Sequence, residues 1–145
     1  MNFDWQKEGF ADTPVLRPAT GAEHLYRAWG GDESRILGNT DRNGVCFSLD
    51  RASSRWDAER LYSIMEYQNP VRWTTEFRTP IGIPLWVGRV HPGDDVRAVL
   101  GRFSGRQVFI ERPYVPLLKV VSTDLLIDDL GQYSTYYGRL ARVSS

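Results

Sequence analysis

Only one stretch of this 145-residue chain has the spacing of an amphipathic helix, and this limits its possible folds more than any other feature. Ser54 and Asp57 resemble a capping box at the start of that helix, and Asn69 with Pro70 ends it. Apolar residues fall on one face between these signals, at Ala58, Leu61, Ile64 and Met65. A parallel α/β fold would need helices alternating with strands throughout. We therefore predict a small α+β domain with mixed or antiparallel sheets and few helices.

The rest of the chain reads as short strands separated by glycine- and proline-containing turns. Strands are predicted at residues 24–29, 45–49, 71–77, 83–90, 107–110 and 115–121. Residues 1–23 contain Pro14 and Pro18 and have no regular period, so we expect an irregular lead-in or a linker there. Residues 24–145 then form a single domain.

Composition excludes several classes of function. Eighteen basic residues balance eighteen acidic ones, so there is no general electrostatic case for binding nucleic acid or acidic lipid. Cys46 is the one cysteine, which excludes an internal disulfide framework and an all-cysteine metal site, and with only His24 and His91 a zinc site would need carboxylates as well. No apolar run has the length of a membrane span, and the start lacks the apolar centre of a signal peptide. We expect a cytoplasmic protein in the cell that makes it, unless another component delivers it elsewhere.

Arg27 is the first candidate for chemistry. It lies inside an otherwise apolar strand, just before Gly30 and Gly31. A guanidinium matches a phosphate bidentately, and the two glycines allow backbone to approach a ligand closely. The alternative from the residues alone is a structural arginine in a partly buried ion pair.

Ser48 and Gln107 are the other candidates. Ser48 ends a strand before a loop and a helix, and its alternative is a serine that bonds its own backbone. Gln107 opens a strand after a basic, glycine-bearing loop, where a neutral amide can hold a sugar hydroxyl; its alternative is a surface glutamine. Carboxylates are less informative: Glu76 is expected to be solvated, the pair at 94–95 to lie in a turn, and the pair at 128–129 to face solvent.

The arginine, serine and glutamine segments together resemble the ADP-ribosyltransferase-like fold of bacterial polymorphic toxins. That family has an arginine on its first core strand, a serine or threonine on the second, and an acidic residue opening a later strand. Here residues 25–31 are similar to the arginine strand, 44–48 to the second strand and 105–110 to the third element. The resemblance covers about residues 24–112.

The resemblance implies a binding site for NAD⁺, which is the substrate, and no metal. Arg27, Ser48 and Gln107 would be catalytic, and the cofactor-binding residues would be Arg27, Ala28, Trp29, Gly30, Phe47, Ser48 and Gln107. Gln107 stands where the transferases have their catalytic glutamate, and Glu111 lies four residues later, in a different register. A glutamine at this point is similar to the NAD-glycohydrolase toxins of the same fold.

The expected function is therefore a toxin domain that hydrolyses the nicotinamide–ribose bond of NAD(P)⁺, with a cognate immunity protein as partner. Glutamine cannot take the proton of an incoming acceptor, which favours water over a macromolecular acceptor. Two alternatives are a mono-ADP-ribosyltransferase using Glu111 or another acid, and a binding module without enzymatic activity.

Overall fold

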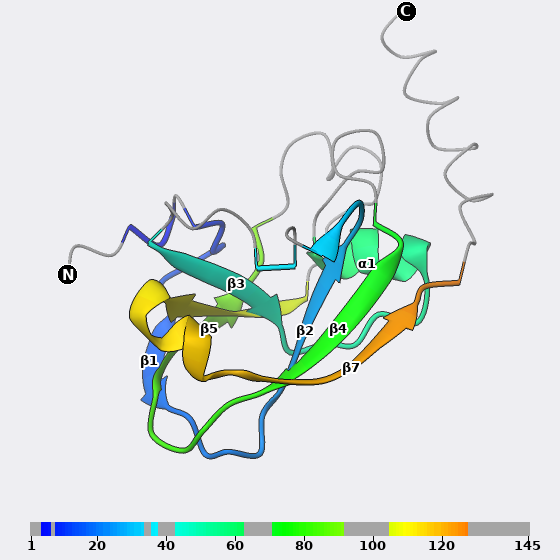
Figure 1. Ribbon diagram of the computed structural model, residues 1–145. Coiled ribbons are helices and arrows are strands. Elements are labelled where there is room, and N and C mark those ends of the chain that lie inside the picture. The colour runs from blue at the N-terminus through cyan, green and yellow to red at the C-terminus, as the bar shows by residue number, and fades with distance from the viewer. Residues whose placement is uncertain are drawn as a thin grey trace, which may run out of the picture.

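The structure, a computed structural model, describes residues 4–6, 8–33, 36–37, 43–62, 71–91 and 105–127. Seven strands form one sheet in the order β1-β5-β6-β3-β2-β4-β7, and every neighbouring pair is antiparallel (Figure 1). The strands are β1 (Val15–Pro18), β2 (His24–Trp29), β3 (Gly44–Ser48), β4 (Trp73–Arg78), β5 (Pro84–Arg89), β6 (Arg106–Glu111) and β7 (Lys119–Leu125). Helix α1 (Arg55–Tyr62) and the 3₁₀ helix η2 (Arg112–Leu117) complete the described elements. The α+β prediction is confirmed.

The two faces of the sheet are covered by different elements. Side chains alternate between the faces, so cross-strand partners share a face. One face packs the main core, in which Leu25, Phe47 and Val108 are buried together with Val115 of η2. On the opposite face, Ala28 packs against a second buried cluster that includes residues of α1. Figure 1 shows η2 in front of the sheet and α1 behind it.

The start of α1 follows the predicted capping pattern. The Asp57 backbone N–H donates to the Ser54 hydroxyl at 3.1 Å, as expected of a helix N-cap. The Asp57 carboxylate accepts from the backbone N–H of Ser53 at 2.9 Å, one residue earlier than a capping box would place it. Ala58 and Leu61 are buried as predicted. The remainder of the predicted helix, residues 63–70, lies outside the described residues.

Two segments differ from their predicted structure. Residues 15–18, expected to be irregular, form β1, which pairs with β5 at the sheet edge; Pro18 is tolerated there because the outer side of an edge strand needs no N–H. Residues 115–121 were predicted to be a strand, but η2 occupies 112–117 and β7 begins only at Lys119. Pro113 at the start of η2 fixes a helical φ and needs no N–H partner, which explains the later strand.

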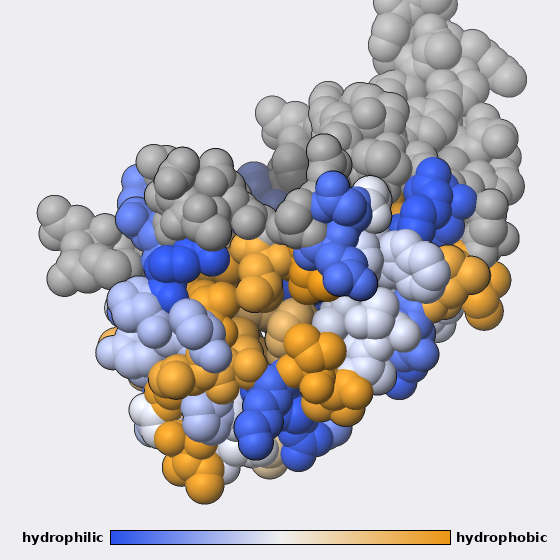
Figure 2. Space-filling view, viewed as in Figure 1, coloured by the Kyte–Doolittle hydropathy of each residue, from blue (hydrophilic) through white to orange (hydrophobic). Residues whose placement is uncertain are grey.

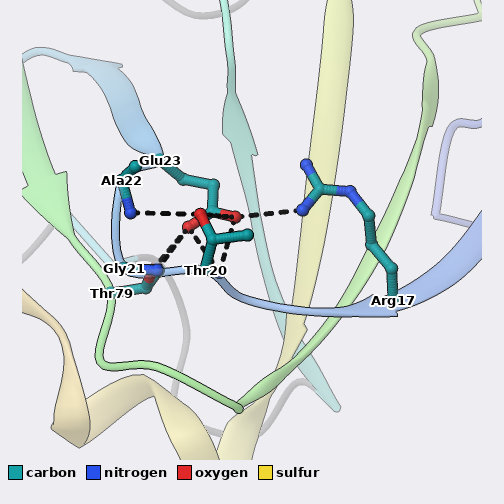
Figure 3. A network of polar contacts seen from close by, with 6 residues as sticks. All are labelled: Arg17, Thr20, Gly21, Ala22, Glu23 and Thr79. Atoms are coloured by element: carbon teal, nitrogen blue, oxygen red, sulfur yellow. Dashed lines mark hydrogen bonds and ion pairs between the residues drawn. The ribbon is translucent and has the colours of Figure 1, made fainter.

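A buried carboxylate holds the turn between β1 and β2 (Figure 3). Glu23 accepts from the backbone N–H groups of Thr20 and Gly21, from the Thr79 hydroxyl, and from the Arg17 guanidinium at 3.0 Å. Burial alone would raise the pKa of Glu23, but the bonds from Thr20 and Arg17 outweigh it and lower the pKa from 4.5 to about 2. The carboxylate therefore stabilises the fold only while it is ionised.

Replacing Glu23 with glutamine should destabilise the protein by about 1–3 kcal/mol at neutral pH, because an amide loses the ion pair and one set of accepted hydrogen bonds. Since the folded pKa of Glu23 lies below the unfolded one, its contribution is complete above about pH 5 and is lost as the pH falls toward 2. Urea unfolding at pH 7 and pH 3 measures both effects. An equal destabilisation at the two pH values would contradict the role of the charge.

Candidate functional site

The two halves of the sheet meet at a single pair of residues. Tyr26 of β2 is paired with Ser48 of β3, whereas β2 follows β4, and β3 follows β6, along their whole lengths. From this pair toward Trp29 and Gly44, β2 and β3 have no further paired residues. An antiparallel sheet that opens in this way exposes backbone groups that a neighbouring strand would otherwise bind.

Arg27 fills part of this opening. On either side of β3, the Leu49 N–H donates to the Arg106 carbonyl, and the Asn43 carbonyl accepts from the Arg112 N–H. Because hydrogen-bonded and non-hydrogen-bonded pairs alternate along an antiparallel ladder, Cys46 belongs to a non-hydrogen-bonded pair. Its carbonyl therefore points away from β6 and toward β2. Arg27 donates to that carbonyl from Nη1 at 3.0 Å. Its Nε donates to the carbonyl of Ile36 at 2.8 Å. The guanidinium thus replaces a missing ladder bond, which is the structural alternative considered from the sequence, and lies at the opening between the strands.

Ser48 and Gln107 are brought together directly. They are cross-strand partners on β3 and β6, and the same alternation makes them a non-hydrogen-bonded pair, in which side chains lie closest. Both are buried, with 5% and 7% of their surface exposed. The Ser48 hydroxyl donates to the Asp50 carbonyl and accepts from the Asp50 N–H, both at 2.9 Å. One lone pair of this oxygen remains beyond these two bonds.

The N-terminal segment covers Gln107, which the sequence did not indicate. The Gln107 amide donates to the Glu8 carbonyl at 3.2 Å, and Gly9 lies next to the same amide. This segment is anchored by the pairing of Phe10 with Val90 and by the burial of the Phe10 ring. Gly88, the partner of Gln107 on β5, makes room for that ring, because a Cβ there would lie 2.8 Å from it. A glycine inside a predicted strand was the available signal for this close approach.

Replacing Gly88 with alanine should therefore disturb the N-terminal segment that covers Gln107. The new methyl group would collide with the Phe10 ring and cost about 1–3 kcal/mol of stability. Phe10→Leu should relieve part of the collision, so the double variant is expected to lose less stability than the two single changes added together. Urea unfolding of the four proteins measures this coupling. Strict additivity would mean that the ring does not rest on Gly88.

Arg27 does not share a face with the other two residues. Tyr26 shares the face of Ser48 and Gln107, so the next residue, Arg27, points to the opposite face, together with Phe47 and Trp29. Figure 2 looks onto the η2 side, where hydrophobic residues surround a hollow near the meeting point of β2 and β3. Ala28 faces α1 and Gly30 follows the strand. Arg27 thus lies in the opening between β2 and β3, whereas Ser48 and Gln107 lie at its closed end, on the opposite face of the sheet.

Sequence reasoning missed a polar row on the face of Ser48. Tyr26 lies between Ser48 and Glu76 of β4. Burial raises the pKa of the Tyr26 phenol, and the charge of Glu76 raises it further, so the phenol stays protonated and serves as a donor. The Glu76 carboxylate also lies 3.3 Å from Nδ1 of the His24 ring and is mostly buried, although it was expected to be solvated. Alternation along β2 and β4 was the signal that could have joined these residues.

Glu111, the alternative acid, lies at the far end of β6 from Gln107. It is paired with Gly44 at the start of β3, and its carboxylate accepts from the Trp86 indole at 3.3 Å. Within the described ranges, no group of three or more histidine, cysteine or acidic side chains is placed to hold a metal ion. No helix among the described residues is long and apolar enough to span a membrane.

Comparison with known proteins finds the fold but not a family. No family model matches the sequence, and no curated protein matches it. The fold is similar to that of Tne2, solved in complex with Tni2, at a TM-score of 0.56 and 15% identity, over 80% of this chain and 94% of that chain. It is equally similar to Rhs1-CT, solved in complex with its cognate immunity protein RhsI1, at a TM-score of 0.56 and 15% identity, over 81% and 85%. At this identity the likeness establishes the shared fold.

Proposed function

We propose that this chain is a toxin domain that hydrolyses NAD(P)⁺ to nicotinamide and ADP-ribose. The observation that carries the proposal is the direct pairing of Ser48 with Gln107 beside the opening that Arg27 occupies. This places on neighbouring strands the three residue types that the resemblance to ADP-ribosyltransferase-like toxins assigns to the dinucleotide.

In this proposal the dinucleotide enters the opening between β2 and β3. Its pyrophosphate takes the Arg27 guanidinium in place of the neutral carbonyls of Ile36 and Cys46, because bonds to an anion are about twice as strong. The nicotinamide ribose lies against Ser48 and Gln107. A ribose hydroxyl donates to the remaining lone pair of the Ser48 oxygen, and the Gln107 amide holds a second hydroxyl.

The reaction breaks the bond between the anomeric carbon of the ribose and the ring nitrogen of nicotinamide. The bonding electrons leave with nicotinamide, which departs neutral, and the sugar gains oxocarbenium character. Water adds to the anomeric carbon and releases one proton to the solvent. Because no strong acid is needed for this leaving group, positioning by Arg27, Ser48 and Gln107 supplies the catalysis.

The position of Glu111 favours hydrolysis over transfer. An acceptor on a protein or nucleic acid usually needs a carboxylate to remove its proton. Glu111 lies four positions after Gln107 along β6, about 13 Å of strand, and the Trp86 indole binds the Glu111 carboxylate there. Glu111 is therefore not placed to serve a reaction beside Ser48.

The toxin part of the proposal is supported by the fold shared with Rhs1-CT, which is bound by a cognate immunity protein. A domain that consumes NAD⁺ would harm the cell that makes it. We therefore propose that this chain acts as an effector delivered to another cell and that its producer holds an immunity protein against it.

The partition of products tests hydrolysis against transfer. The purified chain is incubated with NAD⁺ labelled in the adenylate half, with and without cell extract, and free ADP-ribose and labelled macromolecules are measured together. We expect the label in free ADP-ribose under both conditions. Label on a macromolecule, at the expense of free ADP-ribose, would make the protein a transferase.

A further inference from the structure

An exposed tryptophan lies on the same face of the sheet as Arg27. Trp29 and Trp73 are partners on β2 and β4, and Arg27 is paired with Thr75 two residues away. Cross-strand partners share a face, so all four side chains project from the face opposite Ser48 and Gln107. The dinucleotide proposed above would leave its adenine half on this side of the opening.

The indole rings of Trp29 and Trp73 stack on each other. They are stacked with their planes 25° apart and their centroids 6.1 Å apart. Trp29 is the inner ring, with 7% of its surface exposed, and its indole N–H donates to the Thr75 hydroxyl at 2.8 Å. That hydroxyl is bound in turn to the Thr123 hydroxyl of β7 at 2.9 Å. The hydrogen bond to Thr75 and the stacking on Trp73 therefore both hold the Trp29 ring in place.

Trp73 is the outer ring and keeps 37% of its surface exposed. An aromatic ring that is stacked on a second ring and keeps more than a third of its surface exposed can take a further aromatic ring, and base–aromatic stacking contributes substantially to nucleotide binding. Neighbouring strands are about 4.8 Å apart, so an extended ligand must span roughly 10 Å, from β3 across β2 to β4, to reach both Arg27 and Trp73. A purine joined to the pyrophosphate through its ribose provides such an extended shape.

We propose that Trp73, supported by Trp29, is the stacking surface for the adenine ring of the dinucleotide. This inference rests on the proposed function for the rest of the ligand, but it makes its own claim about an adenine nucleotide. The chemistry recognised is a purine next to a phosphate, and the nicotinamide end takes no part in it.

The test measures binding and turnover separately. Calorimetry gives the Kd of AMP, ADP-ribose and ribose 5-phosphate for the wild type, Trp73→Ala and Trp73→Phe. Leu125→Ala is the matched control, because Leu125 is the partner of Trp73 on β7, is apolar and is 66% exposed, but carries no ring. In parallel, KM is measured for NAD⁺ and for nicotinamide mononucleotide, which lacks adenine.

Trp73→Ala should raise the Kd of AMP and ADP-ribose about tenfold and the KM of NAD⁺ similarly, since one stacked base is worth that much. Trp73→Phe should keep most of the affinity, and Leu125→Ala all of it. Ribose 5-phosphate and nicotinamide mononucleotide should show no change in any variant.

Equal Kd values of AMP for the wild type and Trp73→Ala would overturn the inference, as would a wild type that binds neither AMP nor ADP-ribose. A wild-type dimer that both Trp73→Ala and Leu125→Ala dissociate would also overturn it, because the patch would then be an interface between copies. If AMP binding depends on Trp73 while NAD⁺ is not cleaved, the adenine site stands and the proposed function fails. If NAD⁺ is cleaved with the same KM in Trp73→Ala as in the wild type, the proposed function stands and the adenine site fails.

Discussion

Replacing Gln107 with alanine is expected to lower kcat for NAD⁺ cleavage by about a hundredfold or more, with a smaller change in KM. The amide is proposed to hold a ribose hydroxyl as the sugar becomes cationic, and such preorganised contacts act mainly on the transition state. Nicotinamide release under saturating NAD⁺ measures the effect. Full turnover by this variant would remove Gln107 from the mechanism.

Gln107→Glu keeps the shape of the side chain but removes the N–H group that Gln107 donates. The amide donates to the Glu8 carbonyl, and an ionised carboxylate of the same shape would face that oxygen with no proton to give. We expect this variant to be less stable at neutral pH and to recover in acid, where a protonated carboxyl group donates again. Thermal unfolding at pH 4 and pH 8 follows this. A stability difference from wild type that does not depend on pH would mean that the Glu8 contact contributes little.

Replacing Arg27 with alanine is expected to lower kcat/KM for NAD⁺ by about a hundredfold, chiefly through KM. The proposed bond to the pyrophosphate joins two charged groups, and charge-assisted bonds of this kind contribute about 1.5–3 kcal/mol. Initial rates over a range of NAD⁺ concentrations separate KM from kcat.

Arg27 also has a structural role, so its loss must be read beside a measure of folding. Alanine would leave the carbonyls of Ile36 and Cys46 without their donor, at a cost of about 1–3 kcal/mol of stability. Arg27→Lys keeps the charge but not the planar fork, and should restore only part of the affinity. A variant that melts earlier yet cleaves NAD⁺ with an unchanged KM would show that Arg27 serves the fold alone.

The local patterns of the sequence predicted the centre of the sheet well. Alternation located β4 and β5 to within one or two residues, a short apolar run stopped by glycines located β2, and the cap of α1 was visible in Ser54 and Asp57. These features depend on neighbours in sequence, which is why single-chain patterns detect them. β1 was missed because its four residues, which follow one proline and end on another, are too few to show a period.

The site was predictable only as a set of residues, because its arrangement depends on long-range register. Which residue of β6 opposes Ser48 is decided by pairing between strands far apart in sequence. The contact between Gln107 and Glu8 spans 99 positions, and no local signal indicates it. The same applies to Arg27, whose face follows from the Tyr26–Ser48 pair.

For Ser48, the two roles considered from the sequence are compatible in the structure. From the sequence, a strand-end serine either bonds its own backbone or contacts a ligand. The structure has the first arrangement, since the hydroxyl binds both backbone groups of Asp50. The structure also places Ser48 beside Gln107. The one lone pair of the Ser48 oxygen that remains is then the means of contacting a ligand.

The most direct test of the account is the stoichiometry of NAD⁺ cleavage by the purified chain, with nicotinamide and free ADP-ribose measured in the same sample. We predict equal amounts of both products from the wild type, and a loss of both in the Arg27→Ala and Gln107→Ala variants that remain folded. No nicotinamide from the folded wild type, with or without cell extract, would contradict the account and leave a shared fold without this chemistry.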